Sequence, residues 1–282
     1  MVNRYRLGLY EKAMPNHLSW EEKLAFAKSA NYDWIEISID ATDEKINRIY
    51  WSKEERNQLV TLMQKYELYC ETMNVSSLTK YALGSRNPET VAKGMEIVMG
   101  AIDLATDLGV RLIQIPGYDV YFEEGDDETN QRYLENLKKV VYHAAHKGIA
   151  LGLETMENNY MNTVTKAMRV VNLMKSPYLN IYPDVGNITN AIYQSETKIY
   201  DDMMRGEAHI VAVHLKETKP NIYREVPYGT GHSMFEGAIQ AAKDMGISMF
   251  LGEFWCIDEE NWKEECIDSN QFLRKKIETV FD

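Results

Sequence analysis

Short apolar runs alternate with longer segments of helical period along almost the whole chain. Eight of these runs are rich in β-branched and aromatic residues, which is typical of buried strands. They are Tyr5–Tyr10, Trp34–Ile39, Leu68–Val75, Val110–Ile115, Ile149–Thr155, Leu179–Pro183, His209–Lys216 and Ser248–Trp255. The longer segments carry the period of amphipathic helices. They are Trp20–Ser29, Lys53–Tyr66, Glu89–Leu108, Glu128–Lys147, Val164–Lys175, Glu196–Arg205, Met234–Met245 and Asn261–Phe281.

Several predicted helices carry the residues that begin or end helices. Ser19 with Glu22, and Ser52 with Glu55, have the spacing of a capping box, in which the two residues satisfy each other's backbone N–H groups. Three glycines fall between a helix and the next strand, where a left-handed residue ends the helix. They are Gly109, Gly148 and Gly246.

Eight strand–helix units predict a parallel sheet, because each strand is joined to the next by a helical crossover. Eight such units in a chain of 282 residues fit a closed (β/α)₈ TIM barrel. A doubly wound open sheet is the alternative, but no G-x-G-x-x-G phrase follows the first strand. No linker divides the chain, so we predict a single TIM-barrel domain over residues 1–282.

Composition narrows the class of partner. There are 31 Lys and Arg residues against 43 Asp and Glu, and the net charge of −12 opposes a nucleic acid backbone. No run of 18 apolar residues predicts a membrane span or a signal peptide. The three cysteines, Cys70, Cys256 and Cys266, cannot all pair within the chain, which suits a reducing compartment. We therefore expect a cytoplasmic protein with no nucleic acid or membrane partner.

The predicted strand ends carry residues that bind metal ions. Strands five to eight end with Glu154, Asp184, His214 and Glu253, and in TIM barrels such ends form the working face. One such residue alone is usually a solvated loop residue, whereas four on consecutive strands are hard to explain by structure alone. Three carboxylates and one imidazole suit Mn²⁺, Mg²⁺, Co²⁺ or Zn²⁺. We predict a divalent metal ion as cofactor.

This set of residues suits proton transfer next to a carbonyl group. A divalent ion bound to a hydroxy-ketone acidifies the adjacent C–H and stabilises the enediolate that forms. Two carboxylates on opposite faces of the enediolate give epimerisation, whereas one group acting on one face gives aldose–ketose isomerisation. Glu154 and Glu253 lie three strands apart in a ring of eight, which favours epimerisation.

A basic segment follows the seventh predicted strand. It runs from Lys216 to Gly231, includes Arg224 and ends in two glycines. Loops after strands seven and eight of TIM barrels commonly bind phosphate, and glycines let backbone N–H groups approach an anion. A phosphorylated sugar is therefore a natural substrate; an exposed basic loop is the alternative interpretation.

The chain resembles the L-ribulose-5-phosphate and L-xylulose-5-phosphate 3-epimerases, within the xylose-isomerase-like TIM barrel superfamily. The matching phrases are Gly8–Pro15, Ile35–Asp40, Ile113–Tyr121, Tyr182–Asn187 and Ile210–Pro220. The resemblance implies that Glu154, Asp184, His214 and Glu253 bind the metal and that Glu154 and Glu253 are also the acid/base pair. It implies substrate contacts by Lys216, Asn187, Glu157 and Arg224.

The chain departs from this family after the third strand. The family typically has Ser-Gly/Ala-His-Arg-Arg there, whereas this chain has Ser76-Ser-Leu-Thr-Lys80. If that loop holds the phosphate or the far end of the sugar, the substrate differs. We therefore predict a metal-dependent 3-epimerase of a ketopentose 5-phosphate. The alternatives are a ketose/aldose isomerase, a free-sugar 3-epimerase and a non-catalytic sugar-binding relative. A homodimer is the assembly we expect.

Overall fold

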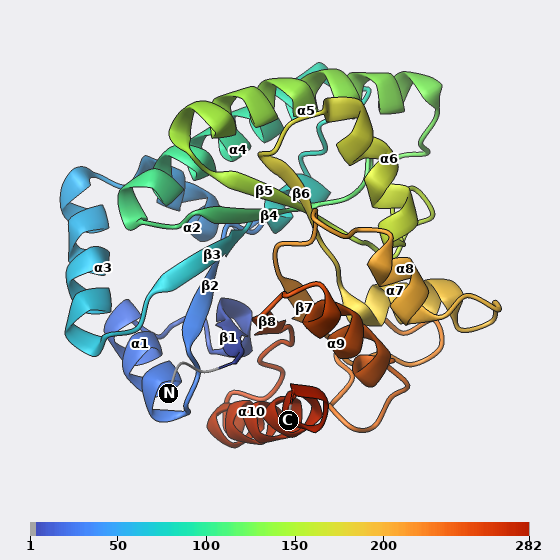
Figure 1. The fold of residues 1–282 in the computed structure, drawn as a ribbon. Helices are drawn as coiled ribbons and strands as arrows, with labels where there is room; N and C mark the ends of the chain where they lie inside the picture. The colour runs from blue at the N-terminus through green and yellow to red at the C-terminus, as the bar shows by residue number, and fades with distance from the viewer. Residues whose placement is uncertain (1–3, 282) are drawn as a thin grey trace.

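The computed structural model describes residues 4–281, and its parallel strands form one sheet that curls into a barrel (Figure 1). The strands are β1 (Arg6–Tyr10), β2 (Trp34–Ser38), β3 (Cys70–Asn74), β4 (Leu112–Pro116), β5 (Ala150–Glu154), β6 (Leu179–Tyr182), β7 (Val213–Leu215) and β8 (Met249–Gly252). They pair in the order β6-β5-β4-β3-β2-β1-β8-β7. Parallel bridges from Ile181 to Ile210 and from Asp184 to His214 bring β6 and the β7 segment together. The predicted (β/α)₈ barrel is confirmed.

Helices surround the sheet on the outside of the barrel (Figure 1). They are α1 (Trp20–Ser29), α2 (Asp43–Ile46), α3 (Lys53–Tyr66), α4 (Pro88–Leu108), α5 (Asp127–Lys147), α6 (Val164–Met174), α7 (Val185–Ile192), α8 (Ile199–Met204), α9 (Phe235–Asp244) and α10 (Trp262–Phe281). Both predicted capping boxes are present, at the starts of α1 and α3. The three glycines predicted to end helices have positive φ. Helix starts and ends could therefore be predicted from local sequence.

The structure differs from the prediction around β6 and β7. Helix α7 begins directly after β6, in a stretch where no helix was predicted, because the side chain of Asp184 accepts a 2.6 Å hydrogen bond from the backbone N–H of Asn187. Strand β7 is also shorter than the predicted run His209–Lys216. The predicted helix Glu196–Arg205 is reduced to α8.

Successive side chains along each strand point alternately into the barrel interior and out toward the helices. On β2, Ile35 and Ile37 join the large core between sheet and helices, whereas Trp34 packs with interior residues of β1 and β8. A Cβ atom on Gly8 would lie 2.4 Å from the Trp34 ring. Trp34 thus fills the barrel interior beside Gly8, whereas buried polar side chains lie at the carboxyl end of the barrel.

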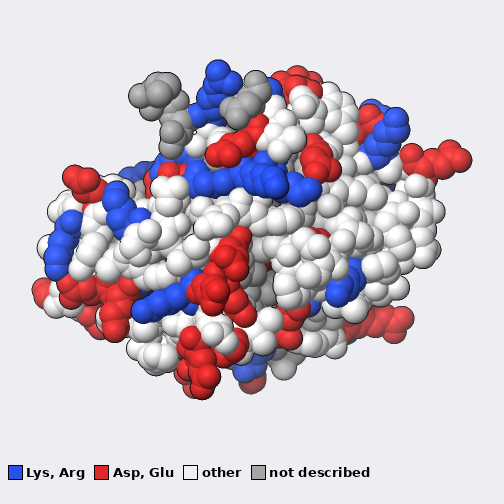
Figure 2. All heavy atoms as spheres, turned by 90° about the horizontal axis from the view of Figure 1, so that it is seen from below, with Lys and Arg blue, Asp and Glu red and all other residues white. Residues whose placement is uncertain are grey.

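The ends of the described chain lie side by side, because Arg4 Nη1 donates a 2.9 Å hydrogen bond to the carbonyl oxygen of Phe281. Figure 2 shows basic and acidic side chains interspersed on the face seen from below, so the net charge of −12 does not form a single acidic surface on that side. Within residues 4–281, no helix has the length and apolar character needed to cross a membrane.

Candidate active site

Four predicted ligand residues meet at the carboxyl end of the barrel. Glu154 ends β5, Asp184 begins α7 after β6, His214 lies in β7, and Glu253 directly follows β8. One ligand atom from each lies within 4.8 Å of the corresponding atoms of the other three, and all four residues are buried. The barrel therefore gathers groups separated by about a hundred positions in the sequence into one cluster.

His214 lies at the centre of this cluster. Its Nδ1 atom is 3.2 Å from Glu154 Oε1 and 3.1 Å from Glu253 Oε2. On the other side of the ring, Nε2 is 3.2 Å from Oε1 of the buried Glu36. The imidazole packs against Tyr182, with ring centroids 4.3 Å apart. Since the Glu36 carboxylate can only accept, it holds the imidazole proton on Nε2 and leaves Nδ1 facing the cluster.

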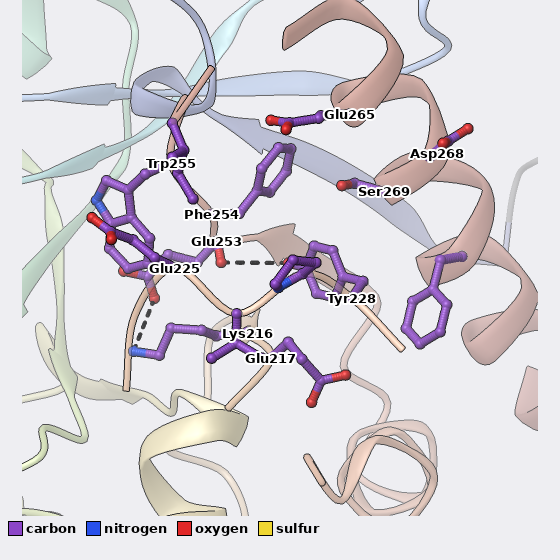
Figure 3. A pocket seen from close by; sticks show the side chains of 14 residues that line it. Lys216, Glu217, Glu225, Tyr228, Glu253, Phe254, Trp255, Glu265, Asp268 and Ser269 are labelled. Carbon is purple, nitrogen blue, oxygen red and sulfur yellow. Dashed lines mark hydrogen bonds and ion pairs between the residues drawn. The ribbon is translucent and has the colours of Figure 1, made fainter. Parts of the chain in front are cut away.

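Lys216 contacts two carboxylates of the cluster. Its Nζ lies 3.2 Å from Asp184 Oδ1 and 3.6 Å from Glu253 Oε2. Figure 3 shows the lysine side chain extended toward Glu253. Burial disfavours the ammonium, but the neighbouring carboxylates, Asp184 first, raise the pKa of Lys216 above its usual value. Lys216 is therefore charged and offsets part of the negative charge.

The protonation of the four-residue cluster reflects a shortage of positive charge. Burial, with Glu253 nearby, raises the pKa of Glu154, and burial raises the pKa of Asp184 well above its usual range. Burial opposes ionisation of Glu253 too, but Lys216 and His214 hold the pKa of that carboxyl below its usual range. Burial disfavours the imidazolium of His214, yet Glu253 and Glu36 raise its pKa well above 6.5. Protons thus supply charge that a cation would otherwise supply.

The donor set fits a divalent cation. Asp184 Oδ2 is buried and accepts no hydrogen bond from any residue between 4 and 281, so one oxygen is left without a partner in the cluster. Buried carboxylates of this kind are paired or coordinate metals. Carboxylate oxygens and one imidazole nitrogen suit Mn²⁺, Mg²⁺, Co²⁺ or Zn²⁺. Glu154, Asp184, His214 and Glu253 would hold the ion.

A cavity of about 430 Å³ opens above the cluster and includes three of the predicted substrate-binding residues. Glu157, Lys216 and Arg224 line it together with Glu154 and Glu253. Glu157 accepts hydrogen bonds from the Tyr121 hydroxyl at 2.5 Å and from Arg224 Nη2 at 2.9 Å.

Asn187, also predicted to contact substrate, is not among the residues that line this cavity. It is buried, and its Nδ2 donates a 2.8 Å hydrogen bond to the carbonyl oxygen of Thr155. Asn187 Oδ1 is buried without a hydrogen-bond partner among the described residues.

Two buried side chains near the cluster were not predicted. Glu36 contacts His214, and the Gln114 amide donates a short hydrogen bond to Glu154 Oε2. Each lies between isoleucines on a strand, Ile35 and Ile37 for Glu36, so the alternation turns the polar residue toward the barrel interior. This alternation of apolar and polar residues is the sequence signal from which Glu36 and Gln114 could have been found.

The loop between β7 and α9 is built differently from the predicted phosphate loop. The carboxylate of Glu217 accepts hydrogen bonds from the N–H groups of Gly229 at 2.9 Å and Ser233 at 3.0 Å. A Cβ atom on Gly231 would lie 2.1 Å from Thr218 O. The Gly229 amide therefore binds a carboxylate of the chain itself, and Gly231 is explained by close packing. Neither glycine provides the evidence for a phosphate that the sequence suggested.

A second cavity of about 380 Å³ shares Lys216, Glu253 and Trp255 with the first. Figure 3 shows the side chains that line this second cavity. Its other walls come from the β7–α9 loop, the segment after β8 and α10, including Tyr228, Phe254 and Phe272. Tyr228 donates a hydrogen bond to the carbonyl oxygen of Leu215. This aromatic wall supports the strand ends that carry Lys216 and Glu253.

Comparison with known proteins places this geometry in a family. Residues 24–276 match the xylose isomerase-like TIM barrel family. The chain is 34% identical over 272 residues, covering 96% of this chain and 94% of the relative, to L-ribulose-5-phosphate 3-epimerase UlaE of Shigella sonnei (strain Ss046).

Solved structures show the same fold at lower identity. A D-psicose 3-epimerase from Clostridium cellulolyticum H10, solved with D-tagatose, has a TM-score of 0.78 at 17% identity, over 96% of this chain and 99% of its own. An L-ribulose 3-epimerase has a TM-score of 0.75 at 20% identity, over 98% and 95%. The chain is thus an enzyme of the isomerase class that belongs to the xylose isomerase-like TIM barrel family and, within it, to the L-ribulose-5-phosphate 3-epimerase family.

Proposed function

We propose that this protein is a divalent-metal-dependent epimerase acting at C3 of a ketopentose 5-phosphate, interconverting L-ribulose 5-phosphate and L-xylulose 5-phosphate. The observation that carries the proposal is that Glu154 and Glu253 come from different strands and both reach His214 Nδ1, at 3.2 and 3.1 Å. They arrive from β5 and β8, three strands apart, as an acid/base pair for the two faces of one carbon requires. The curated relatives at 34% identity are named L-ribulose-5-phosphate 3-epimerases.

In the proposed mechanism the two glutamates exchange roles with the direction of reaction. A divalent cation held by the four-residue cluster would polarise the C2 carbonyl and stabilise negative charge on the adjacent oxygens. One glutamate removes the C3 proton from one face, and the other returns a proton to the opposite face, which inverts the carbon. Because epimerisation is reversible, each of Glu154 and Glu253 is the base in one direction and the acid in the other.

Neighbouring residues hold the pair in place. The Gln114 amide fixes one oxygen of Glu154, and the Lys216 ammonium lies 3.6 Å from Glu253 Oε2. Both glutamates are almost completely buried, with 4% and 6% of their surface exposed. Exclusion of water strengthens these charge interactions and protects the enediolate from side reactions.

We also propose where the enzyme is located, what it binds and how it assembles. Free Cys70, Cys256 and Cys266 support a cytoplasmic location, because a reducing compartment keeps thiols unpaired. The partner is a small sugar phosphate, and a homodimer remains the assembly we predict.

The test is NMR in D₂O with metal-stripped protein, added Mn²⁺ or Mg²⁺, and L-ribulose 5-phosphate. The expected result is solvent deuterium at C3 together with L-xylulose 5-phosphate, both abolished by EDTA. Exchange at C1 with an aldose product would instead show a ketose/aldose isomerase. Exchange with a free ketose and none with the phosphate ester would show a free-sugar 3-epimerase. Binding of the sugar without exchange would show a non-catalytic relative.

A further inference from the structure

The loop between β7 and α9, residues 216–234, carries Arg224 to the active-site cavity. An isolated bridge joins Lys219 to Ile222, and most residues from 219 to 231 are exposed. A loop with so few buried apolar side chains opens easily unless polar contacts hold it. The contacts that hold this loop therefore decide how Arg224 is presented to the cavity.

Glu217 ties the two ends of this loop together from the inside. It is 4% exposed, and its Oε1 accepts hydrogen bonds from the backbone N–H groups of Thr218 at 3.1 Å and Ser233 at 3.0 Å. Its Oε2 accepts a third hydrogen bond, from the Gly229 N–H at 2.9 Å. Figure 3 shows the carboxylate pointing away from the Lys216 ammonium, so it faces the loop rather than the metal cluster. Backbone N–H groups thus satisfy this buried charge.

Asn190 of α7 ties the middle of the same loop. It is 7% exposed, and its Nδ2 donates a 2.6 Å hydrogen bond to Thr218 Oγ1. Its Oδ1 accepts a 3.3 Å hydrogen bond from the backbone N–H of Asn221 and lies 3.1 Å from His232 Nε2. Because Asp184 caps α7, the metal cluster and the loop share one supporting helix.

Arg224 lies between these ties, three residues after Asn221 and five before Gly229. Its side chain is 52% exposed and pairs with Glu157 at 2.9 Å. An ion pair this exposed contributes little to holding a side chain in one place. The placement of Arg224 at the cavity therefore depends on the backbone that carries it, and the two buried side chains hold that backbone.

We propose that Glu217 is a positioning residue, which together with Asn190 holds the β7–α9 loop so that Arg224 reaches the substrate. The wall of the cavity is then set before the substrate binds, so that ordering of the loop does not reduce the affinity for the substrate. The identity of the substrate rests on the proposed function. Glu217 acts through Arg224 rather than by contact with the sugar.

Hydrogen exchange followed by NMR tests the Glu217 contacts without any turnover. In wild-type protein the amides of Gly229 and Ser233 should exchange slowly. In Glu217→Gln they should exchange at least about 10-fold faster, because the side-chain amide offers one acceptor oxygen where the carboxylate offers two. Glu225→Gln makes the same chemical change at an exposed position of the same loop and should leave both amides protected. Fast exchange of both amides in wild type would show that Glu217 does not hold the loop.

A double-mutant cycle then tests whether Glu217 acts through Arg224. With Mn²⁺-loaded protein and L-ribulose 5-phosphate, Glu217→Gln and Arg224→Met should each raise KM by about 10-fold, with kcat changed less. The double variant should be no worse than Arg224→Met alone, because a misplaced arginine and an absent one lose the same contact. Mn²⁺ affinity should stay at the wild-type value in Glu217→Gln, which a general disturbance of β7 would not allow. Additive effects on KM would overturn the positioning role.

Asn190→Ala gives a second route to the same test if circular dichroism shows that Glu217→Gln does not fold. It should raise KM in the same direction and again be non-additive with Arg224→Met. A wild-type protein that binds the sugar without turnover would overturn the proposed function alone. The same cycle, measured as Kd by calorimetry, would then decide the positioning role.

Discussion

Glu36 Oε1 lies 3.2 Å from His214 Nε2, on the side of the imidazole away from Glu154 and Glu253. The second Glu36 oxygen accepts a 2.6 Å hydrogen bond from Thr72 Oγ1, so the carboxylate is fixed from both ends. Glu36 and Thr72 are both fully buried inside the barrel. The contact therefore orients the imidazole and keeps its other nitrogen available to a metal ion.

Replacing Glu36 with glutamine should weaken metal binding by about 10- to 100-fold, because the neutral amide no longer fixes the imidazole tautomer. The measurement is competition for Mn²⁺ or Zn²⁺ against a chelator of known affinity. Thr72→Val, which loosens Glu36 without removing its charge, should have a smaller effect in the same direction. Wild-type affinity in Glu36→Gln would contradict the orienting role.

We expect Glu154 and Glu253 each to be required for turnover. Glu154→Gln and Glu253→Gln should each lower kcat by about 10²- to 10⁴-fold, the usual contribution of a positioned acid or base. Ligand affinity should fall much less, because the amide keeps the volume of the side chain. Paired measurements of kcat and of L-ribulose 5-phosphate binding check this. If either variant turns over at the wild-type rate, that glutamate does not transfer the proton.

Features that depend on residues close together in the sequence could be predicted, whereas contacts between residues far apart in the chain could not. Glu154 and Glu253 could be placed because each follows a short apolar run, and the carboxyl ends of parallel strands share one face of a barrel. Caps such as Ser19 with Glu22 are equally local. The alternation around Glu36 turns its side chain into the barrel, but nothing local indicates its partner, since His214 lies 178 positions later in the chain.

Helix α7 was missed for a related reason. Its start depends on Asp184, which the sequence analysis had assigned to the metal site alone, and the side chain also caps the helix through the Asn187 N–H. A stretch of eight residues is shorter than the window in which a helical period can be recognised.

Removal of the metal should lower thermal stability, because an ion that binds the folded protein and not the unfolded chain stabilises the fold by mass action. Titrating metal-stripped protein with Mn²⁺ to about 100 times Kd should add about 2.7 kcal/mol of stability, or roughly 5–10 °C in Tm for a chain of this size. Asp184→Asn should abolish most of that shift. Scanning calorimetry with and without Mn²⁺ makes the comparison, and an equal shift in both proteins would place the ion elsewhere.

Glu11, directly after β1, is the centre of a buried ionic network. Its carboxylate is fully buried and pairs with Arg48 Nη1 at 2.6 Å and Lys23 Nζ at 2.8 Å. It also accepts a 2.9 Å hydrogen bond from the backbone N–H of Ser38. Burial alone would raise the pKa of Glu11, but Arg48 and the nearby lysines hold it well below its ordinary value of 4.5. The network anchors the segment that carries Lys12 to the end of β2.

This lowered pKa predicts how stability depends on pH. A carboxyl that binds its proton less readily in the folded protein stabilises the fold above its unfolded pKa, and that contribution is lost as the pH falls toward the folded pKa. Relative to Glu11→Gln, the wild-type free energy of unfolding should therefore fall by about 1.4 kcal/mol for each pH unit below about 4.5. At pH 7 the variant itself should be less stable by about 3–5 kcal/mol, since Arg48 loses its buried partner.

Urea unfolding followed by circular dichroism between pH 7 and pH 3 measures the Glu11 contribution as the difference between the two curves. Glu54→Gln, on the exposed surface of α3, controls for the general effect of replacing a carboxylate by an amide. Its curve should run parallel to that of wild type, because an exposed side chain has no buried cations around it. Should the Glu11→Gln curve also run parallel to wild type, the pKa of Glu11 would be the same in the folded and the unfolded protein, and the cations around it would not lower it.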